Sequence, residues 1–171
     1  SRELDKTFQL LPQPQSIELT SGKGINYWEL SYILSSDTTS IPILGDMLNK
    51  LPRCPRKGKP IRLQLTSQHV PASPEGYMME INEKGVCISA RTMTGIFYGC
   101  QTLEQLMEDS RDFNILIPAM LIIDYPAISY RAVHFDVKHH LDRMEYYYQE
   151  IDKLARYKIN AVIWELEDKL R

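Results

Sequence analysis

A strand–helix–strand pattern near the end of the sequence constrains the fold most. "YRAVHFDV" (residues 130–137) and "INAVIWEL" (residues 159–166) are apolar strand patterns, and "LDRMEYYYQEIDKLARYK" (residues 141–158) between them has helical periodicity. The short connections predict a βαβ unit, in which two parallel strands are joined by a right-handed crossover. Because parallel sheets need cover on both faces, we expect this unit to open a larger α/β fold that the chain does not contain.

Single residues predict how the helix of this unit begins and which face it buries. Asp142, with Glu145 three residues later, matches a capping box. The apolar stripe consists of Met144, Tyr147 or Tyr148, Ile151, Leu154 and Ala155.

The sequence before residue 127 predicts an α+β layer, with strands, a hairpin and two helices. Ile17 and Leu19 alternate as in an edge strand, and "IRLQL" is a second strand pattern. "YMMEI" and "VCISA", separated by the turn residues "NEKG", predict a hairpin. Apolar residues over 43–51 indicate a short amphipathic helix after Pro42. We place a domain boundary near residue 127.

The strongest helix pattern of this first part has two glycines inside it. Thr92 or Thr94 can cap the helix, which we expect to run to about Asp109. Gly95 and Gly99 lie four residues apart, and glycine weakens a helix relative to alanine. The gain that we expect in return is a close approach of the helix to the sheet.

Charge and cysteine content argue against several kinds of function. A net charge of −2 provides no basic stripe for nucleic acid, and no apolar run is long enough to cross a bilayer. The three cysteines Cys54, Cys87 and Cys100 match no zinc pattern, and their odd number argues against a disulfide framework. We expect them to be small buried apolar side chains.

Charged side chains follow both strands of the βαβ unit, where an α/β barrel collects its functional residues. These residues are His134, Asp136, Lys138, His139, Glu165, Glu167 and Asp168. Three interpretations remain open: a metal site, a polar sugar-binding rim, or solvated charges at the starts of loops.

A metal site would use His134, His139, His140, Asp136 and the acidic residues that follow the second strand. Their spacing matches no HExxH or similar pattern, and strand alternation places His134 beside Asp136 but His139 in a loop. Arg131 is a different case, because a guanidinium near the start of an apolar strand needs a partner or a ligand.

Three motifs occur in order along nearly the whole chain. "GIFYGCQTLEQL" (residues 95–106) is the central one, "IDYPAISYRAVHFD" (residues 123–136) follows, and "YKINAVIWEL" (residues 157–166) comes last. Together with "LLPQPQSIEL" near the start, they resemble glycoside hydrolase family 20, the β-N-acetylhexosaminidases.

The resemblance implies a fold and two domains. Residues 1–127 would be the family's non-catalytic α+β domain, a zincin-like mixed sheet with two helices on one face and no metal. Residues 128–171 would be the first β-α-β of a truncated (β/α)8 catalytic barrel. The strands over 133–135 and 162–164 would then lack barrel neighbours, so we expect packing on the first domain, pairing between chains, or disorder.

The resemblance also implies a reaction. Such an enzyme removes terminal β-linked N-acetylhexosamine from glycans by substrate-assisted, retaining hydrolysis. It uses an Asp-Glu pair after barrel strand 4, without a cofactor. That strand is not in this chain, and Glu167-Asp168 has the wrong order on the wrong strand. We therefore expect no catalytic residue here and no activity from these residues alone.

Four residues would contact or support the sugar by this resemblance. Arg131 matches the family arginine that binds hydroxyls of the terminal sugar, and Asp136 is a rim residue. His139 falls at the strand-1 histidine of the family, after Lys138 instead of arginine. Glu165 replaces the histidine of the usual "WHL.D", which indicates a divergent branch with another substrate.

A binding module without chemistry is the main alternative. An exposed aromatic patch of Tyr27, Trp28 and Tyr32 would favour glycan or partner docking, whereas core packing of these rings would not. The expected partner of the parent enzyme is a carbohydrate, with no nucleic acid and no membrane. Export from the cytoplasm is weakly favoured by the resemblance.

Overall fold

The computed structural model describes residues 4–35, 58–137 and 142–166. Its contacts divide the chain into two compact units, Ser1–Pro126 and Ala127–Arg171. Each unit has its own sheet.

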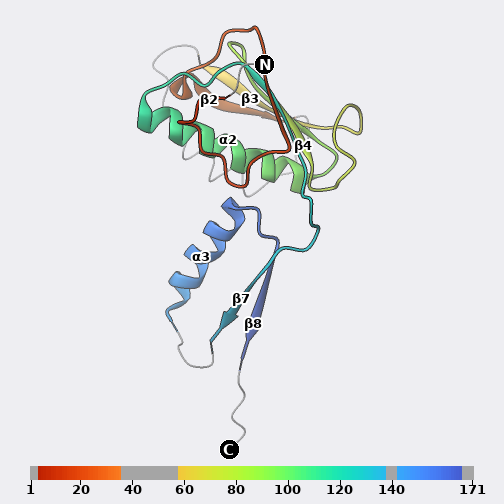
Figure 1. The fold of residues 1–171 in the computed structure, drawn as a ribbon, viewed down its shortest axis with the longest axis vertical. Helices are drawn as coiled ribbons and strands as arrows, with labels where there is room; N and C mark the ends of the chain where they lie inside the picture. Colours follow the sequence, from red (N-terminus) through yellow and green to blue (C-terminus); the bar gives the residue numbers. More distant parts are fainter. Residues whose placement is uncertain (1–3, 36–57, 138–141, 167–171) are drawn as a thin grey trace, which may run out of the picture. The chain divides into compact units, whose positions relative to one another are not determined.

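A mixed six-stranded sheet forms the first unit (Figure 1). The strands are β1 (Ser16–Leu19), β2 (Leu30–Ser35, preceded by the short η1 helix Tyr27–Glu29), β3 (Lys59–Leu65), β4 (Tyr77–Asn82), β5 (Gly85–Ala90) and β6 (Met120–Asp124). Their order is β1-β6-β4-β5-β3-β2, antiparallel from β1 to β5 and parallel from β5 to β2. The α+β class, the β4–β5 hairpin and the edge position of β1 are confirmed.

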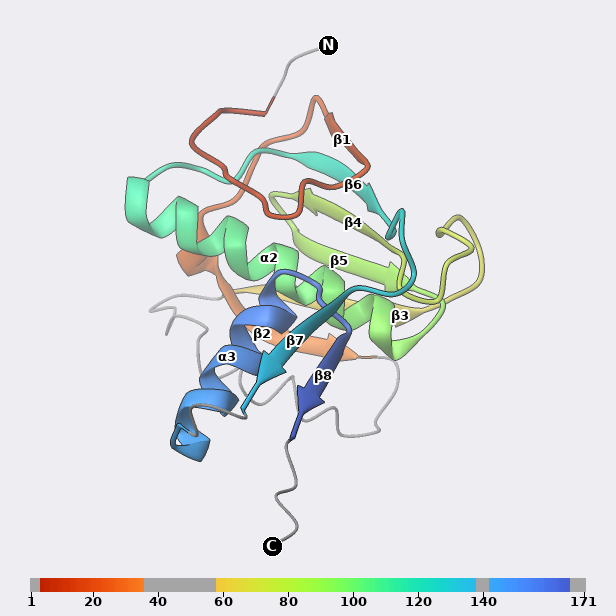
Figure 2. The same ribbon diagram turned by 60° about the horizontal axis from the view of Figure 1, so that its bottom comes forward.

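Strand alternation gives this sheet one strongly apolar face, across which α2 (Met93–Phe113) lies (Figure 2). On β4, Tyr77, Met79 and Ile81 are fully buried, whereas Glu80 between them is exposed. Val86, Ile88 and Ala90 of β5 lie opposite these three residues and continue the layer. Burial of this layer is the main force that holds helix and sheet together.

Two glycines let α2 lie directly on the sheet. A Cβ on Gly99 would be 2.5 Å from Cγ2 of Ile88, and one on Gly95 would collide with the carbonyl oxygen of Gly76. The expected close approach is therefore confirmed. Of the two candidate caps, Thr92 is the N-cap, and its Oγ1 accepts a hydrogen bond of 3.3 Å from the Gly95 N–H.

The α2 helix extends beyond the predicted end near Asp109 and reaches Phe113. Asn114 then adopts the left-handed conformation, with φ of 51°, that commonly ends a helix. The helix predicted over 43–51 and the residue Cys54 lie outside the described residues.

The second unit consists of β7 (Ala132–Asp136), α3 (Met144–Arg156) and β8 (Ala161–Glu165). The two strands pair in parallel, with Ala132 opposite Ala161 and Asp136 opposite Glu165, which confirms the predicted βαβ unit. Both strands are formed, so disorder is the wrong alternative for them. Pairing between chains stays a prediction.

The start of α3 differs from the predicted capping box. The N-cap is Arg143, which makes no side-chain cap bond, so Asp142 is not the N-cap that the predicted capping box requires. The Asp142 N–H donates to the hydroxyl of Tyr147, one turn into α3, at 3.2 Å. Tyr147 is 5% exposed and Tyr148 is 61% exposed, which decides between the two tyrosines of the predicted stripe.

Candidate functional site

An aromatic cluster defines one face of the β7–β8 pair. The ring of Tyr147 on α3 lies 6.0 Å from that of Phe135 and 5.2 Å from that of Trp164. Phe135 and Trp164 stack across the strands at 5.0 Å. The helix therefore covers the side that carries Val133, Phe135, Val162 and Trp164, which we call the helix face.

The opposite side of the pair carries the polar candidates. Strand alternation and the register place Ala132, His134, Asp136, Ala161, Ile163 and Glu165 on this side, which we call the histidine face. Its composition changes along the strands. The alanines lie at the N-terminal ends, and Asp136 and Glu165 lie opposite each other at the C-terminal ends.

A contact between an imidazole and a carboxylate links the two strands on the histidine face. Nε2 of His134 lies 2.9 Å from Oε2 of Glu165, and the two side chains are 49% and 37% exposed. At that distance Nε2 carries the proton and donates to the carboxylate. The structure thus brings together two of the residues that the sequence predicted at one rim, with Asp136 beside Glu165 in the register.

Arg131 lies at the other end of the strand pair. Its Nε donates to the carbonyl oxygen of Lys158 and its Nη1 to that of Ile128, both at 2.7 Å. The Asn160 side chain accepts from the Arg131 N–H at 2.9 Å and donates to the Ser129 carbonyl at 2.7 Å. These bonds fasten the turn before β8 to the start of β7, so the guanidinium has the partners that its position demands.

Arg131 and the acidic residues are therefore not brought together along the strand. Arg131 precedes the first residue of β7, whereas Asp136 is the last residue of that strand. Five residues of extended chain span about 16 Å. The resemblance had assigned Arg131, Asp136 and Glu165 to one sugar-binding site. Their positions along the strands place the backbone of Arg131 at the opposite end from the two acidic residues.

Several predicted site residues lie outside the described residues: Lys138, His139, His140, Glu167 and Asp168. Within the described parts of the chain, no group of three or more His, Cys, Asp or Glu side chains is placed to hold a metal ion.

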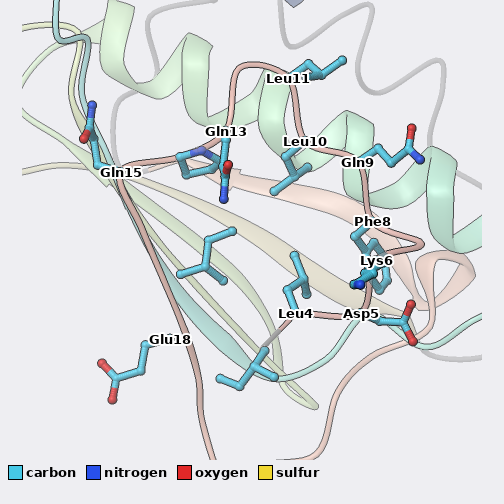
Figure 3. A pocket seen from close by; sticks show the side chains of 13 residues that line it. Leu4, Asp5, Lys6, Phe8, Gln9, Leu10, Leu11, Gln13, Gln15 and Glu18 are labelled. Carbon is cyan, nitrogen blue, oxygen red and sulfur yellow. The ribbon is translucent and has the colours of Figure 1, made fainter. Parts of the chain in front are cut away.

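The first unit has an open hollow of about 860 Å³ beside its N-terminal segment (Figure 3). Residues from Leu4 to Leu19 line it, with Gln9, Gln13 and Gln15 among the polar side chains. The Gln105 side chain of α2 holds this segment, because its Oε1 accepts from the Leu11 N–H at 2.9 Å and its Nε2 donates to the Leu11 carbonyl at 2.8 Å. None of the predicted site residues lines the hollow.

The aromatic residues before β2 divide between core and surface. Tyr27 packs against the core, whereas Trp28 and Tyr32 are 43% and 42% exposed. Two of the three rings are thus exposed, as a binding module would need.

Sequence reasoning missed a buried polar network in the first unit. The Tyr77 hydroxyl lies 2.6 Å from Oγ1 of Thr102 and donates to Oδ2 of Asp124 at 3.2 Å. Burial, and then the charge of Asp124, raise the pKa of Tyr77 well above its usual range. Strand alternation could have revealed this network, because it places Asp124 on the same buried face of β6 as Met120 and Ile122. The network joins β4, β6 and α2, and is structural.

The buried thiol of Cys100 is a poor nucleophile. Cys100 is buried in α2, and burial, with a smaller effect of the Glu104 charge, raises the pKa of its thiol to about 12. Cys87 is half-buried on β5, and both are free thiols. Within the described residues, no helix has the length and apolar composition that crossing a bilayer requires.

Comparison with known proteins identifies the first unit directly. Residues 7–125 match the family described as "Glycosyl hydrolase family 20, domain 2". A β-hexosaminidase of Porphyromonas gingivalis is 36% identical over 105 residues, which is 58% of this chain and 14% of that protein. A β-N-acetylhexosaminidase of Cellulomonas fimi is 27% identical over 175 positions, covering 93% of this chain and 34% of that protein.

A solved structure extends the similarity into the second unit. The Streptomyces plicatus N-acetyl-β-hexosaminidase in complex with Thio-NAglucal matches with a TM-score of 0.76 and 27% identity, over 96% of this chain and 35% of that chain. The chain thus spans about a third or less of the length of these relatives. Because the family match covers most of its residues, this chain belongs to glycosyl hydrolase family 20.

Proposed function

We propose that this chain forms the N-terminal part of an enzyme that removes terminal β-linked N-acetylhexosamine from glycans. The observation that carries the proposal is the match of residues 7–125 to domain 2 of family 20. Relatives named as β-N-acetylhexosaminidases that align over more than nine-tenths of the chain support it. Hydrolysis would be substrate-assisted and retaining, the exception that this family makes to the two-carboxylate scheme.

The two units would have separate tasks in that enzyme. Residues 1–127 would be the non-catalytic, zincin-like domain, and their mixed sheet under α2 supports this assignment. Residues 128–171 would begin the (β/α)8 barrel, which the parallel β7–β8 pair supports. Ile163 and Trp164 are 47% and 42% exposed, and further barrel elements would bury these side chains.

The place of each site residue on the strands indicates its role. Asp136 and Glu165 would lie at the sugar-binding rim, because they occupy the C-terminal ends of parallel strands. By the resemblance Arg131 would bind sugar hydroxyls, although its guanidinium donates to two backbone carbonyl oxygens at the end of the strands opposite to the rim. His139 would support the rim. No residue of this chain would form or break the glycosidic bond.

A chromogenic N-acetylglucosaminide tests the proposal with two proteins. The complete enzyme that contains this chain is expected to release the chromophore, whereas the chain of residues 1–171 is expected to remain at background. Absence of turnover by the complete enzyme would sink the proposed activity. Turnover by residues 1–171 would show that these residues suffice, against the assignment of catalysis to an Asp-Glu pair elsewhere.

Non-catalytic glycan binding is a second candidate, favoured by the exposed rings of Trp28 and Tyr32. Aromatic faces bind the apolar faces of sugars at low entropic cost. Titration of the chain with chitooligosaccharides, monitored by tryptophan fluorescence, tests it. Binding that is lost in Trp28→Ala but kept in Trp164→Ala would support this role, and no fluorescence change would exclude it.

A further inference from the structure

We propose that Pro126 and Ala127 form a hinge between the two units, and that a side-chain clamp on each side keeps the motion from spreading beyond it. The first clamp is Gln15, which holds the end of the first unit. The second clamp consists of Arg131 and Asn160, which hold the beginning of the second unit. The inference concerns the chain itself and does not depend on the proposed activity.

The first clamp holds the residues directly before Pro126. Gln15 precedes β1 and lies opposite Asp124 in the register of β1 and β6. Its N–H donates to Oδ1 of Asp124 at 3.2 Å, and its Nε2 donates to the carbonyl oxygen of Tyr125 at 3.1 Å. Because Oδ2 of Asp124 also accepts from the Tyr77 hydroxyl at 3.2 Å, the clamp is tied to the buried network of the first unit.

The second clamp holds the residues directly after Ala127. Nη1 of Arg131 donates to the Ile128 carbonyl oxygen, and Nδ2 of Asn160 donates to the Ser129 carbonyl oxygen, both at 2.7 Å. Oδ1 of Asn160 accepts in turn from the Arg131 N–H at 2.9 Å. Because a peptide group is planar, a bond to its carbonyl oxygen holds the whole group. The peptide groups that follow Ile128 and Ser129 are therefore held to the second unit.

The hinge is the short piece of chain between the two clamps. Within the described residues, neither Pro126 nor Ala127 takes part in a hydrogen bond or an ion pair, and Ala127 is exposed. The proline ring fixes its own φ and restricts the residue before it, so little rotation is left on that side. The remaining rotations are centred on Ala127, and a few residues that absorb backbone rotation in this way are typical of hinges between domains.

The clamps decide what a rotation at the hinge does to each sheet. The second clamp lies between Ala127 and β7, so a rotation turns β7 and β8 together and leaves their register unchanged. The first clamp protects the end of β6 in the same way. Movement between domains is the default expectation unless a large apolar interface prevents it. The clamped hinge allows such movement without distorting the strand pair of the second unit.

Backbone 15N relaxation of residues 1–171 tests the inference. The amides of Ala127 and Ile128 lie within the hinge, so their order parameters are expected below about 0.6, whereas those of Tyr125, Ser129 and Tyr130 should stay near 0.85, the value of rigid backbone. Residual dipolar couplings should require a separate alignment tensor for each sheet. Equal order parameters from Tyr125 to Tyr130, or one tensor for both sheets, would overturn the inference.

Gln15→Met tests the first clamp, because methionine keeps the length of the side chain but cannot donate to the Tyr125 carbonyl. The order parameter of the Tyr125 amide is expected to fall from about 0.85 to about 0.6. Gln13→Met is the matched control, since it makes the same exchange two residues earlier at an exposed side chain. It is expected to leave the Tyr125 amide unchanged.

Asn160→Ala tests the second clamp. The N–H of Tyr130 belongs to the peptide group of the Ser129 carbonyl, so the Tyr130 amide is expected to become as mobile as that of Ala127. An unchanged Tyr125 amide in Gln15→Met, or an unchanged Tyr130 amide in Asn160→Ala, would overturn the clamp concerned. Should one variant fail to fold, the wild-type profile and the other variant decide by the same criteria.

Discussion

At the scale of single residues, the absence of a side chain sets the distance between α2 and the sheet. Glycine costs about 1 kcal/mol in a helix relative to alanine, so Gly95 would be a poor choice if local preference alone decided. Space for a Cβ is missing at this position because the Gly76 carbonyl and Ala90 lie directly beneath. The contact with the sheet outweighs the helical preference.

We therefore expect Gly95→Ala to destabilise the chain by about 1–3 kcal/mol, although alanine is the better helix former. The physical reason is that α2 must shift away from backbone atoms that cannot yield. Urea unfolding measures the difference. Thr94→Ala, an exposed change one residue earlier, serves as the control and should lie within about 0.5 kcal/mol of the wild type. A neutral Gly95→Ala would show that the helix has room to move.

The buried thiol of Cys100 predicts a dependence of stability on pH. Its pKa is raised to about 12 in the folded state, whereas an exposed thiol titrates near 8.5. Above about pH 9 the unfolded state loses a proton that the folded state keeps, so stability is complete below that pH and falls as the pH rises toward 12.

The loss due to Cys100 should approach about 1.4 kcal/mol per pH unit, the free energy of one proton. Cys100→Ala removes this contribution, so its curve of unfolding free energy against pH should be flatter between pH 9 and 11. Urea unfolding of both proteins at several pH values measures the two slopes. Identical slopes would contradict the assigned burial.

At the scale of elements, side-chain bonds to the backbone fix the turn between α3 and β8. Lys158 is in the left-handed conformation, with φ of 60°, and Asn160 bridges Ser129 and Arg131. The Ala161 N–H donates to the Arg131 carbonyl at 3.2 Å, where β8 begins. The register of the two strands is thus anchored at the end opposite to the acidic residues.

Asn160→Ala is expected to loosen this anchor, because it removes two hydrogen bonds of about 1 kcal/mol each. Hydrogen exchange at the Ala161 amide should accelerate roughly 5- to 30-fold. Asn82→Ala, in the β4–β5 hairpin, deletes the same side chain from the other unit and should not alter that amide. An unchanged Ala161 rate in Asn160→Ala would show that strand pairing alone holds the turn.

At the scale of the whole molecule, the two units differ in how much core each contains. The large buried cluster of the described residues lies wholly between Phe8 and Ile122, in the first unit. In the second unit, Tyr147 is the buried apolar side chain among those described. Stability within one chain varies with buried apolar contact, so the units should open independently.

Hydrogen exchange of residues 1–171 should reveal this difference. Amides of β4 and β5 are expected to exchange only through global unfolding of the first unit, and those of β7 and β8 much faster, through local opening. Equal protection of both sheets would mean that the second unit shares the stability of the first.

The sequence predicted the elements whose signals are local. Period-two alternation predicted β3, β4 and β5, the spacing of Gly95 and Gly99 predicted a close helix–sheet contact, and the motif "GIFYGCQTLEQL" indicated the family. The errors lie at helix ends: α3 has Arg143 as its N-cap, and α2 continues past Asp109 to Phe113, where the left-handed Asn114 follows.

By itself, the sequence determined the order of strands and helices, the βαβ unit and the membership of family 20, because apolar periodicity and motif spacing are properties of the chain. Tertiary structure alone decided the pairing of His134 with Glu165, the binding of Arg131 to backbone carbonyls and the burial of Asp124 beside Tyr77. Each of these depends on which atoms meet across strands or turns. Hydrogen bonds and ion pairs act over about 3 Å, and only the folded chain brings residues so far apart in sequence to that distance.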